Sequence, residues 1–159
     1  MSNFIAKPGQ VDYTNVRYAP VINIVLAYGR EILLVQRSQV LRTYPGYWSG
    51  ISGYLDDQQS LKEKVYSELL EEANIPTAAV GEVILANIFH QEALEYHKTW
   101  IVHAILARLN DARTKSQIEL DWEAEQYAWV DIDAVSEWNV LPGFIDVLAA
   151  VRPYIQQGK

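Results

Sequence analysis

The segment from Gly53 to Ile75 constrains the fold most, because it places acidic side chains on the apolar side of a predicted helix. Ser60 is a candidate N-cap and Glu63 follows three residues later, a spacing that is typical of a helix start. An apolar stripe at four-residue spacing follows, formed by Leu61, Val65 and Leu69. The pattern therefore predicts a helix that packs this stripe against a core.

Two glutamates continue the apolar stripe. At roughly 100° per residue, Glu68 and Glu72 fall within about 20° of the centre of its first turn, and Glu71 lies to one side. Like charges at this spacing repel, and partial burial increases the cost. A bound divalent cation would convert the repulsion into a stabilising contact. The alternative is a solvated acidic turn, which is common in helices.

Two glycines, Gly50 and Gly53, lie in the β-prone segment that runs into the predicted helix. Glycine inside a strand indicates a bulge or a close approach of the backbone to a ligand. We therefore consider a backbone carbonyl near Gly53 as a neutral oxygen ligand beside the glutamates.

The segment resembles the Nudix box, G-x5-E-x7-R-E-U-x-E-E-x-G-U, in which U is a bulky aliphatic residue. The matching positions are Gly53, Glu68, Leu69, Glu71, Glu72 and Ile75. Three positions depart from the pattern: Gln59 replaces the first glutamate, Ser67 the arginine and Asn74 the second glycine. The flanking pattern is also similar to this family over most of the chain.

The departures have a physical interpretation. Asn74 is compatible with a left-handed helix end, since asparagine tolerates this conformation. In the family, the missing glutamate and arginine resemble an ion pair that orients the metal-binding glutamates. Here both charges are absent together, so we predict that a neutral contact between Gln59 and Ser67 takes their place.

Several strand-like runs surround the predicted acidic helix. Strands are predicted at residues 19–28, 31–37, 48–55, 80–91, 97–109 and 122–130, with further helices at 133–138 and from Pro142 onward. This order predicts an α/β fold in which a mixed sheet packs between helices. The family resemblance implies the same arrangement, a Nudix-type α/β/α sandwich with a mixed β-sheet. We expect residues 1–159 to form one domain, with residues 1–18 as an N-terminal arm or an early strand.

Composition excludes several classes of protein. The chain has no cysteine, so disulfides, thiolate metal sites and a cysteine nucleophile are excluded, and a cytoplasmic location is expected. No run approaches the ~18 apolar residues of a membrane span. The net charge of −7, without a lysine–arginine cluster, argues against non-specific nucleic-acid binding. An anionic substrate would then require metal ions to screen its phosphates.

The resemblance implies a hydrolase that cleaves a nucleoside diphosphate linked to another group, using water and Mg²⁺ or Mn²⁺. Glutamate oxygens suit these hard cations. We expect Glu68 and Glu72 to ligate the metal, with Glu71 as a ligand or an outer partner. The metal would polarise the diphosphate and lower the pKa of the attacking water, and Glu68 is one candidate for the general base.

A second candidate base lies downstream. The family often carries a pattern similar to E-x-x-x-Y-x-W, and Glu123, Tyr127 and Trp129 match it. Glu123 is therefore a candidate base or additional ligand; the alternative is a solvated residue of an acidic loop. For the substrate, Arg37 is a candidate phosphate contact. Trp48 and Tyr54 are candidates for stacking on a base, the alternative being ordinary core packing.

Two other functions are rivals to the hydrolase. A prenyl-diphosphate isomerase of the same fold needs a catalytic cysteine, which this chain lacks. A nucleotide-binding or interaction module without catalysis is kept open by Gln59 and Ser67. Specificity is expected from the N-terminal arm, from the Asn110–Asp121 loop and from a homodimer surface if one forms.

Overall fold

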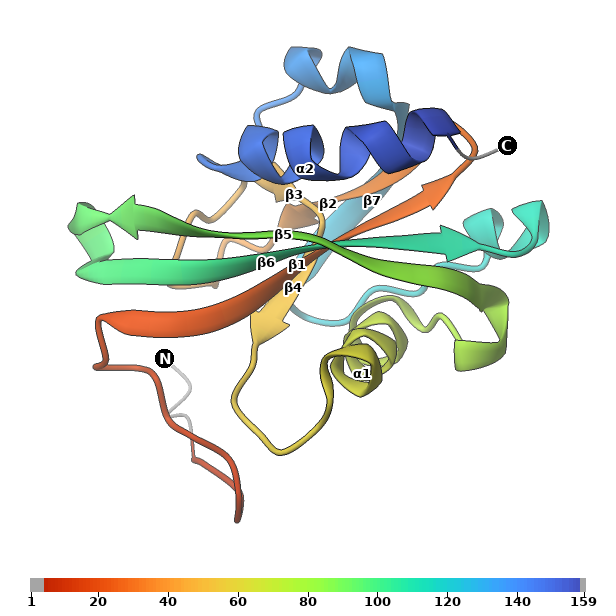
Figure 1. Ribbon diagram of the computed structural model, residues 1–159. Coiled ribbons are helices and arrows are strands. Elements are labelled where there is room, and N and C mark those ends of the chain that lie inside the picture. Colours follow the sequence, from red (N-terminus) through yellow and green to blue (C-terminus); the bar gives the residue numbers. More distant parts are fainter. Residues whose placement is uncertain (1–4, 158–159) are drawn as a thin grey trace.

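The computed structural model describes residues 5–157 and is built around a twisted mixed β-sheet (Figure 1). The strands are β1 (Tyr18–Tyr28), β2 (Glu31–Arg37), β3 (Trp48–Ser49), β4 (Ile51–Tyr54), β5 (Val80–Ala93), β6 (Lys98–Leu109) and β7 (Ala124–Asp131). The helices are α1 (Leu61–Ala73) and α2 (Phe144–Gln157), and short 3-10 turns connect several elements. No helix within residues 5–157 is long and apolar enough to cross a membrane.

The sheet has both parallel and antiparallel neighbours. Its main path runs β3-β2-β1-β6-β5, while β4 pairs with β1 and β7 pairs with β2. The β1–β6 pair is parallel and the other pairs are antiparallel. Helix α2 covers one face and α1 the other (Figure 1). The predicted mixed sheet between helices is therefore confirmed.

Strand β1 divides its side chains between two cores. Ile22, Ile24 and Leu26 point into the core beneath α1, and Val25 and Ala27 point into the core beneath α2. Successive strand residues point to opposite faces, so an apolar run in a strand covered on both sides serves both cores. This explains why the β1 sequence is continuously apolar rather than alternating.

Helix α1 begins and ends where its caps predict. The Ser60 hydroxyl accepts a hydrogen bond from the Glu63 backbone N–H at 3.2 Å. Asn74 adopts a left-handed conformation with φ 55°, and its N–H donates to the carbonyls of Leu69 and Leu70. Both predicted caps are therefore confirmed, and they fix which turn of α1 carries the glutamates.

The predicted strand at residues 48–55 is divided in two. Strand β3 pairs with β2, whereas β4 pairs with β1, and Gly50 lies at the break. A Cβ atom on Gly50 would lie 2.4 Å from the Ile24 carbonyl oxygen, so only glycine fits at this crossing. The predicted helix at 133–138 is a 3-10 turn, Ile132–Glu137.

Residues 5–17 form an arm rather than a strand. The buried Lys98 amino group donates to the carbonyls of Tyr13 and Val16, and the Val11 N–H donates to the Asp56 carbonyl. The Tyr13 ring stacks on Tyr54 with centroids 5.9 Å apart. The arm is thereby held against the carboxyl end of β4, beside the start of the loop to α1.

Replacing Leu69 with alanine should destabilise the protein far more than the same change at Leu70. Leu69 is fully buried beneath α1, whereas its neighbour is 49% exposed. A buried leucine truncation costs about 2–5 kcal/mol, and we expect less than about 1 kcal/mol at the exposed position. Urea unfolding followed by circular dichroism measures both, and equal losses would contradict the assigned helix face.

Candidate active site

Three carboxyl groups meet between the last turns of α1 and the loop that precedes β7. Glu72 lies in the middle, and its carboxyl group is close enough to those of Glu68 and Glu123 for each neighbour to shift its pKa. Glu68 and Glu72 are one helical turn apart on α1, as their spacing predicts. Sequence positions 68 and 123 are thus brought together by the fold.

The end of α1 positions Glu123. The N–H groups of Glu119 and Asp121 donate to the carbonyls of Ala73 and Glu72, which are among the free carbonyls at a helix end. The Asp121 carboxylate then accepts from the Glu123 N–H at 3.0 Å, and the Glu123 carbonyl accepts from the Ser38 N–H. These hydrogen bonds hold the acidic loop against the helix.

Burial disfavours the charged form of all three carboxyls. Desolvation raises the pKa of Glu68 and Glu123 above the ordinary value of 4.5. It raises the pKa of Glu72 well above that value, and the neighbouring carboxyls of Glu68 and Glu123 raise it further. The cluster therefore holds protons more tightly than exposed glutamates, unless a cation is present.

The donor set fits a hard divalent cation. The three side chains offer only carboxyl oxygens, and Oε2 of Glu72 is buried without a hydrogen-bond partner among the described residues. No group of three or more histidine, cysteine, aspartate or glutamate side chains within residues 5–157 is already arranged as a metal-binding cluster. The desolvated carboxyls and the unpartnered Oε2 atom of Glu72 are the features that fit a metal ion here.

Gly53 lies directly against the Glu68 carboxylate. A Cβ atom at this position would be 2.6 Å from Cδ of Glu68 and 2.7 Å from its Oε1, so any larger residue would displace the carboxylate. Gly53 is paired with Ile22 in the sheet, which fixes its backbone. The glycine therefore allows the Glu68 carboxylate to pack on β4.

Arg37, at the end of β2, lies close enough to the cluster for its charge to interact with those of Glu123 and Glu72. Its Nε and Nη2 atoms donate to the Thr43 carbonyl at 3.0 and 2.9 Å, and Nη2 also donates to the Thr43 hydroxyl. Burial lowers the pKa of Arg37, and the charges of Glu123 and Glu72 oppose that shift. The guanidinium is thus fixed beside the carboxylates.

A cavity of about 1040 Å³ opens beside these groups. Six of the predicted site residues line it: Arg37, Gly53, Tyr54, Glu68, Glu71 and Glu123. Residues 11–15 of the arm form part of its wall, as do residues 40–44 of the loop after β2. Glu72 lies behind the wall, in contact with Glu68 and Glu123.

Aromatic residues form another wall of the same cavity. The Tyr44 ring packs edge-on against Tyr96, with centroids 5.0 Å apart, and Trp100 packs 6.2 Å from Tyr44. The Tyr44 hydroxyl donates to Glu95, and its backbone N–H donates to the Tyr96 hydroxyl. We call Tyr44, Tyr96 and Trp100 the aromatic wall. It joins the loop after β2 to the tip of the β5–β6 hairpin.

Trp48 lies elsewhere. Its ring packs edge-on against Trp138, with centroids 4.7 Å apart, and it borders the core beneath α2. Residue 48 is on β3, so the break at Gly50 separates it from the cavity-lining part of β4. Trp48 is not among the residues that line the cavity, and its stacking on a base stays a prediction.

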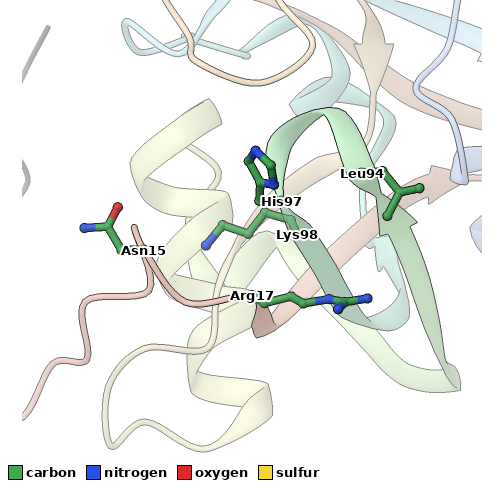
Figure 2. A pocket seen from close by; sticks show the side chains of 5 residues that line it. All are labelled: Asn15, Arg17, Leu94, His97 and Lys98. Carbon is green, nitrogen blue, oxygen red and sulfur yellow. The ribbon is translucent and has the colours of Figure 1, made fainter.

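A smaller pocket of about 270 Å³ lies near the aromatic wall and is lined by Asn15, Arg17, Leu94, His97 and Lys98. Figure 2 shows that the side chains of Lys98 and Arg17 extend in opposite directions. Lys98 is committed to the arm carbonyls and Arg17 donates to the Thr99 hydroxyl. This pocket therefore presents no converging cationic groups.

Gln59 and Ser67 are in contact, as their paired replacement predicts. The Ser67 hydroxyl donates to Gln59 Oε1 at 2.7 Å, and Gln59 Nε2 donates to Asp57 at 3.0 Å. A neutral hydrogen bond thus occupies the two positions at which the Nudix box carries opposite charges.

Sequence reasoning missed Lys64 and the aromatic wall. The i, i+4 spacing of Lys64 and Glu68 was available as a signal, because such pairs are neighbours on a helix. No local signal could have brought Tyr44 to Tyr96, since that contact depends on the docking of a loop on a distant hairpin. The arm was expected to contribute to specificity, and it does line the cavity.

The chain has detectable relatives. The family model described as NUDIX domain matches residues 17–150. A protein named NAD-capped RNA hydrolase NudC, from Chromobacterium violaceum, is 28% identical over 127 residues. That alignment covers 80% of this chain but only 42% of the relative, so the chain spans less than half of that protein's length.

Two solved structures illustrate the likeness in fold. A C. elegans Ap4A hydrolase binary complex superposes with a TM-score of 0.69 at 20% identity, covering 88% of this chain and 99% of that one. The NUDIX domain of Shewanella oneidensis NrtR, complexed with ADP ribose, also gives a TM-score of 0.69, at 14% identity, covering 87% and 88%. At these identities, the superpositions establish the fold alone.

Replacing Glu72 with glutamine should stabilise the metal-free protein at pH 8. Because the pKa of this carboxyl is raised on folding, the folded state binds more protons than the unfolded state above pH 4.5, and stability falls as the pH rises. The amide removes that loss, and we expect a gain on the order of 1 kcal/mol at pH 8 and little change near pH 5.

Thermal unfolding with EDTA at both pH values measures this difference. The matched control is Glu63→Gln, on the exposed first turn of the same helix, which should not change the pH dependence. A Glu72→Gln protein that is less stable than wild type at pH 8 would show that the carboxylate is favourably paired.

Proposed function

The chain belongs to the Nudix domain family, and on that premise we propose that it is a pyrophosphohydrolase acting on a nucleoside diphosphate linked to another group. The observation that carries the proposal is the contact of Glu68, Glu72 and Glu123, which gathers buried carboxyls beside a large cavity. Such a cluster is costly unless it binds a cation or transfers protons. Phosphoanhydride hydrolysis uses both properties.

The residues that would hold Mg²⁺ or Mn²⁺ are Glu68 and Glu72, with Glu71, Glu123 and the Gly53 carbonyl as further oxygen donors. A divalent cation bound there supplies charge neutralisation for the phosphates and lowers the pKa of a bound water. The orphaned Oε2 atom of Glu72 and the desolvated carboxyls support this assignment. Metal dependence is part of the proposal.

The general base is either Glu68 or Glu123. Both line the cavity, and both have a pKa raised by burial, which brings a carboxylate closer to the pKa of a useful base at neutral pH. Arg37 is fixed by Thr43 at the cavity wall, where its guanidinium can donate to a phosphate oxygen. Water is then the attacking nucleophile, and no covalent enzyme intermediate forms.

The group beyond the diphosphate would meet aromatic surface. Tyr54 and the aromatic wall line the cavity, and planar bases pack favourably on such rings. NAD-capped RNA, Ap4A and ADP ribose, which appear in the names of the similar proteins, all contain adenosine attached to two or more phosphates. We therefore place small adenosine-containing diphosphates first among candidate substrates.

A binding module without catalysis is the second candidate function. The observation that favours it is the neutral contact between Gln59 and Ser67, where the Nudix box carries charges. The hydrolase is preferred because three of the four glutamates of the box are present, and two of them, Glu68 and Glu72, lie together with Glu123 where desolvation acts on their carboxyls. One hydrolase domain, a cytoplasmic location and a homodimer remain predictions from the sequence.

Glutamine substitutions distinguish the two functions. We expect Mg²⁺-dependent turnover of one or more compounds among ADP-ribose, dinucleoside polyphosphates, sugar nucleotides and nucleoside triphosphates, measured as phosphate-containing products by ion-exchange chromatography. Glu72→Gln should lower kcat by about 10²–10⁴-fold, because removing this group removes metal binding or proton transfer.

The matched control is Glu125→Gln, an exposed glutamate two residues from Glu123, which should retain wild-type turnover. Binding of a nucleotide without any turnover by the wild-type protein would support the module instead. Full activity in the Glu72→Gln protein would refute the assigned site.

A further inference from the structure

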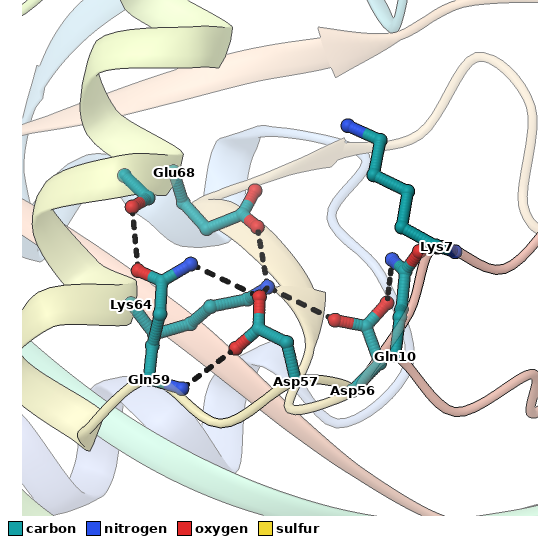
Figure 3. Close-up of polar contacts among 8 residues, drawn as sticks. Lys7, Gln10, Asp56, Asp57, Gln59, Lys64 and Glu68 are labelled. Carbon is teal, nitrogen blue, oxygen red and sulfur yellow. Dashed lines mark hydrogen bonds and ion pairs between the residues drawn. The ribbon is translucent and has the colours of Figure 1, made fainter.

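Lys64 is a buried cation that contacts one of the candidate metal ligands. Its side chain is 8% exposed, and its amino group lies 3.0 Å from Asp56 Oδ1 and 3.1 Å from Asp57 Oδ2. The same group lies 3.7 Å from Glu68 Oε1, one helical turn further along α1. Figure 3 shows the amino group at the centre of these three carboxylates. The ammonium donates hydrogen bonds to Asp56 and Asp57 and pairs with Glu68 through charge alone.

The Lys64 amino group is itself held from two sides. Asp56 is buried, and its second oxygen accepts a hydrogen bond from Gln10 Nε2 at 2.9 Å, which ties it to the N-terminal arm. Asp57 accepts from the Gln59 side chain (Figure 3). The Gln59 side chain in turn accepts from the Ser67 hydroxyl. The ammonium therefore has little freedom to move toward or away from Glu68.

The Glu68 carboxylate is confined between this ammonium and the backbone of β4. Gly53 lies against one side of the carboxylate, with space for no side chain, and Lys64 lies near Oε1. Two constraints on a planar group fix its orientation. The ion pair with Lys64 is made by Oε1, so it leaves Oε2 of Glu68 available to a cation.

We propose that Lys64 is a positioning residue that holds Glu68 in its metal-binding orientation, through contacts that the neutral Gln59–Ser67 pair cannot supply. This inference rests on the proposed function, since it assigns Lys64 a role toward the cation of that site. Lys64 acts through Glu68 and is not itself a metal ligand, because an ammonium has no lone pair to donate.

A purely structural role for Lys64 makes a different prediction. If the ammonium only neutralised Asp56 and Asp57, its removal would lower stability but leave the metal affinity of the folded protein unchanged. If it positions Glu68, the metal affinity of the folded protein falls as well, because supporting contacts of a ligand typically contribute about 10–100-fold in affinity. Metal affinity measured well below the melting temperature separates the two.

The test compares Mn²⁺ binding by wild type, Lys64→Gln and Lys62→Gln, using electron paramagnetic resonance of free Mn²⁺ on the full chain without substrate. Lys62 is an exposed lysine on the same helix, so its replacement changes the net charge equally without touching Glu68. We expect Lys64→Gln to weaken Mn²⁺ binding about 10–100-fold and Lys62→Gln to leave the binding unchanged. Thermal unfolding of each protein is recorded in parallel.

A double variant, Asp56→Asn/Lys64→Gln, covers the case in which the single change prevents folding, since it removes the buried ion pair as a unit. It should fold and bind Mn²⁺ as weakly as the single variant. Wild-type affinity in either folded variant, or an equal loss in Lys62→Gln, overturns the inference alone. No Mn²⁺ uptake by the wild-type protein contradicts the proposed metal site, and this inference with it.

Discussion

The burial of like charges at the end of α1 is the constraint on which the site depends. Glu68, Glu72 and Glu123 contact each other where desolvation raises the pKa of each. Lys64 pairs with Glu68, and the charge of Arg37 acts on Glu123 and Glu72; both cations are themselves fixed by other residues. The surplus of negative charge is stabilised when the site binds a cation, and it is unfavourable when no cation is bound.

The elements around the site can be understood as ways of holding that charge in place. Gly53 gives the Glu68 carboxylate room to lie on β4, and the end of α1 accepts hydrogen bonds from the loop that carries Glu123. The arm reaches the same region through Asp56. Paired strands and a capped helix end therefore hold the acidic side chains, which is the arrangement that fixes ligands before a substrate arrives.

Local features of the sequence were enough to predict α1, its caps and the strands of the sheet. Ser60, Asn74 and the apolar spacing of Leu61, Val65 and Leu69 act within a few residues of each other, so their meaning does not depend on the rest of the fold. The resemblance to the Nudix box then indicated which acids to examine. The family and the mixed sheet were confirmed, while the roles of individual site residues remain proposals.

The features that escaped prediction all depend on contacts between distant segments. The division of residues 48–55 follows from the approach of Gly50 to the Ile24 carbonyl, and it moved Trp48 away from the cavity. Tyr44 meets Tyr96 only because a loop docks on a hairpin tip. The burial of Lys64 requires Asp56, whose position depends on the arm. Periodicity carries no information about such pairings.

The attachment of the arm has a consequence for access to the site. Residues 5–17 are held by a few polar contacts and one ring stack, and the apolar side chains of Ile5, Val11 and Val16 remain 83%, 48% and 43% exposed. Separating such a segment exposes little new apolar surface, so it costs less free energy than disrupting the sheet. Because residues 11–15 line the cavity, separation of the arm would open that side of the cavity while the strands beneath the carboxylates stay paired.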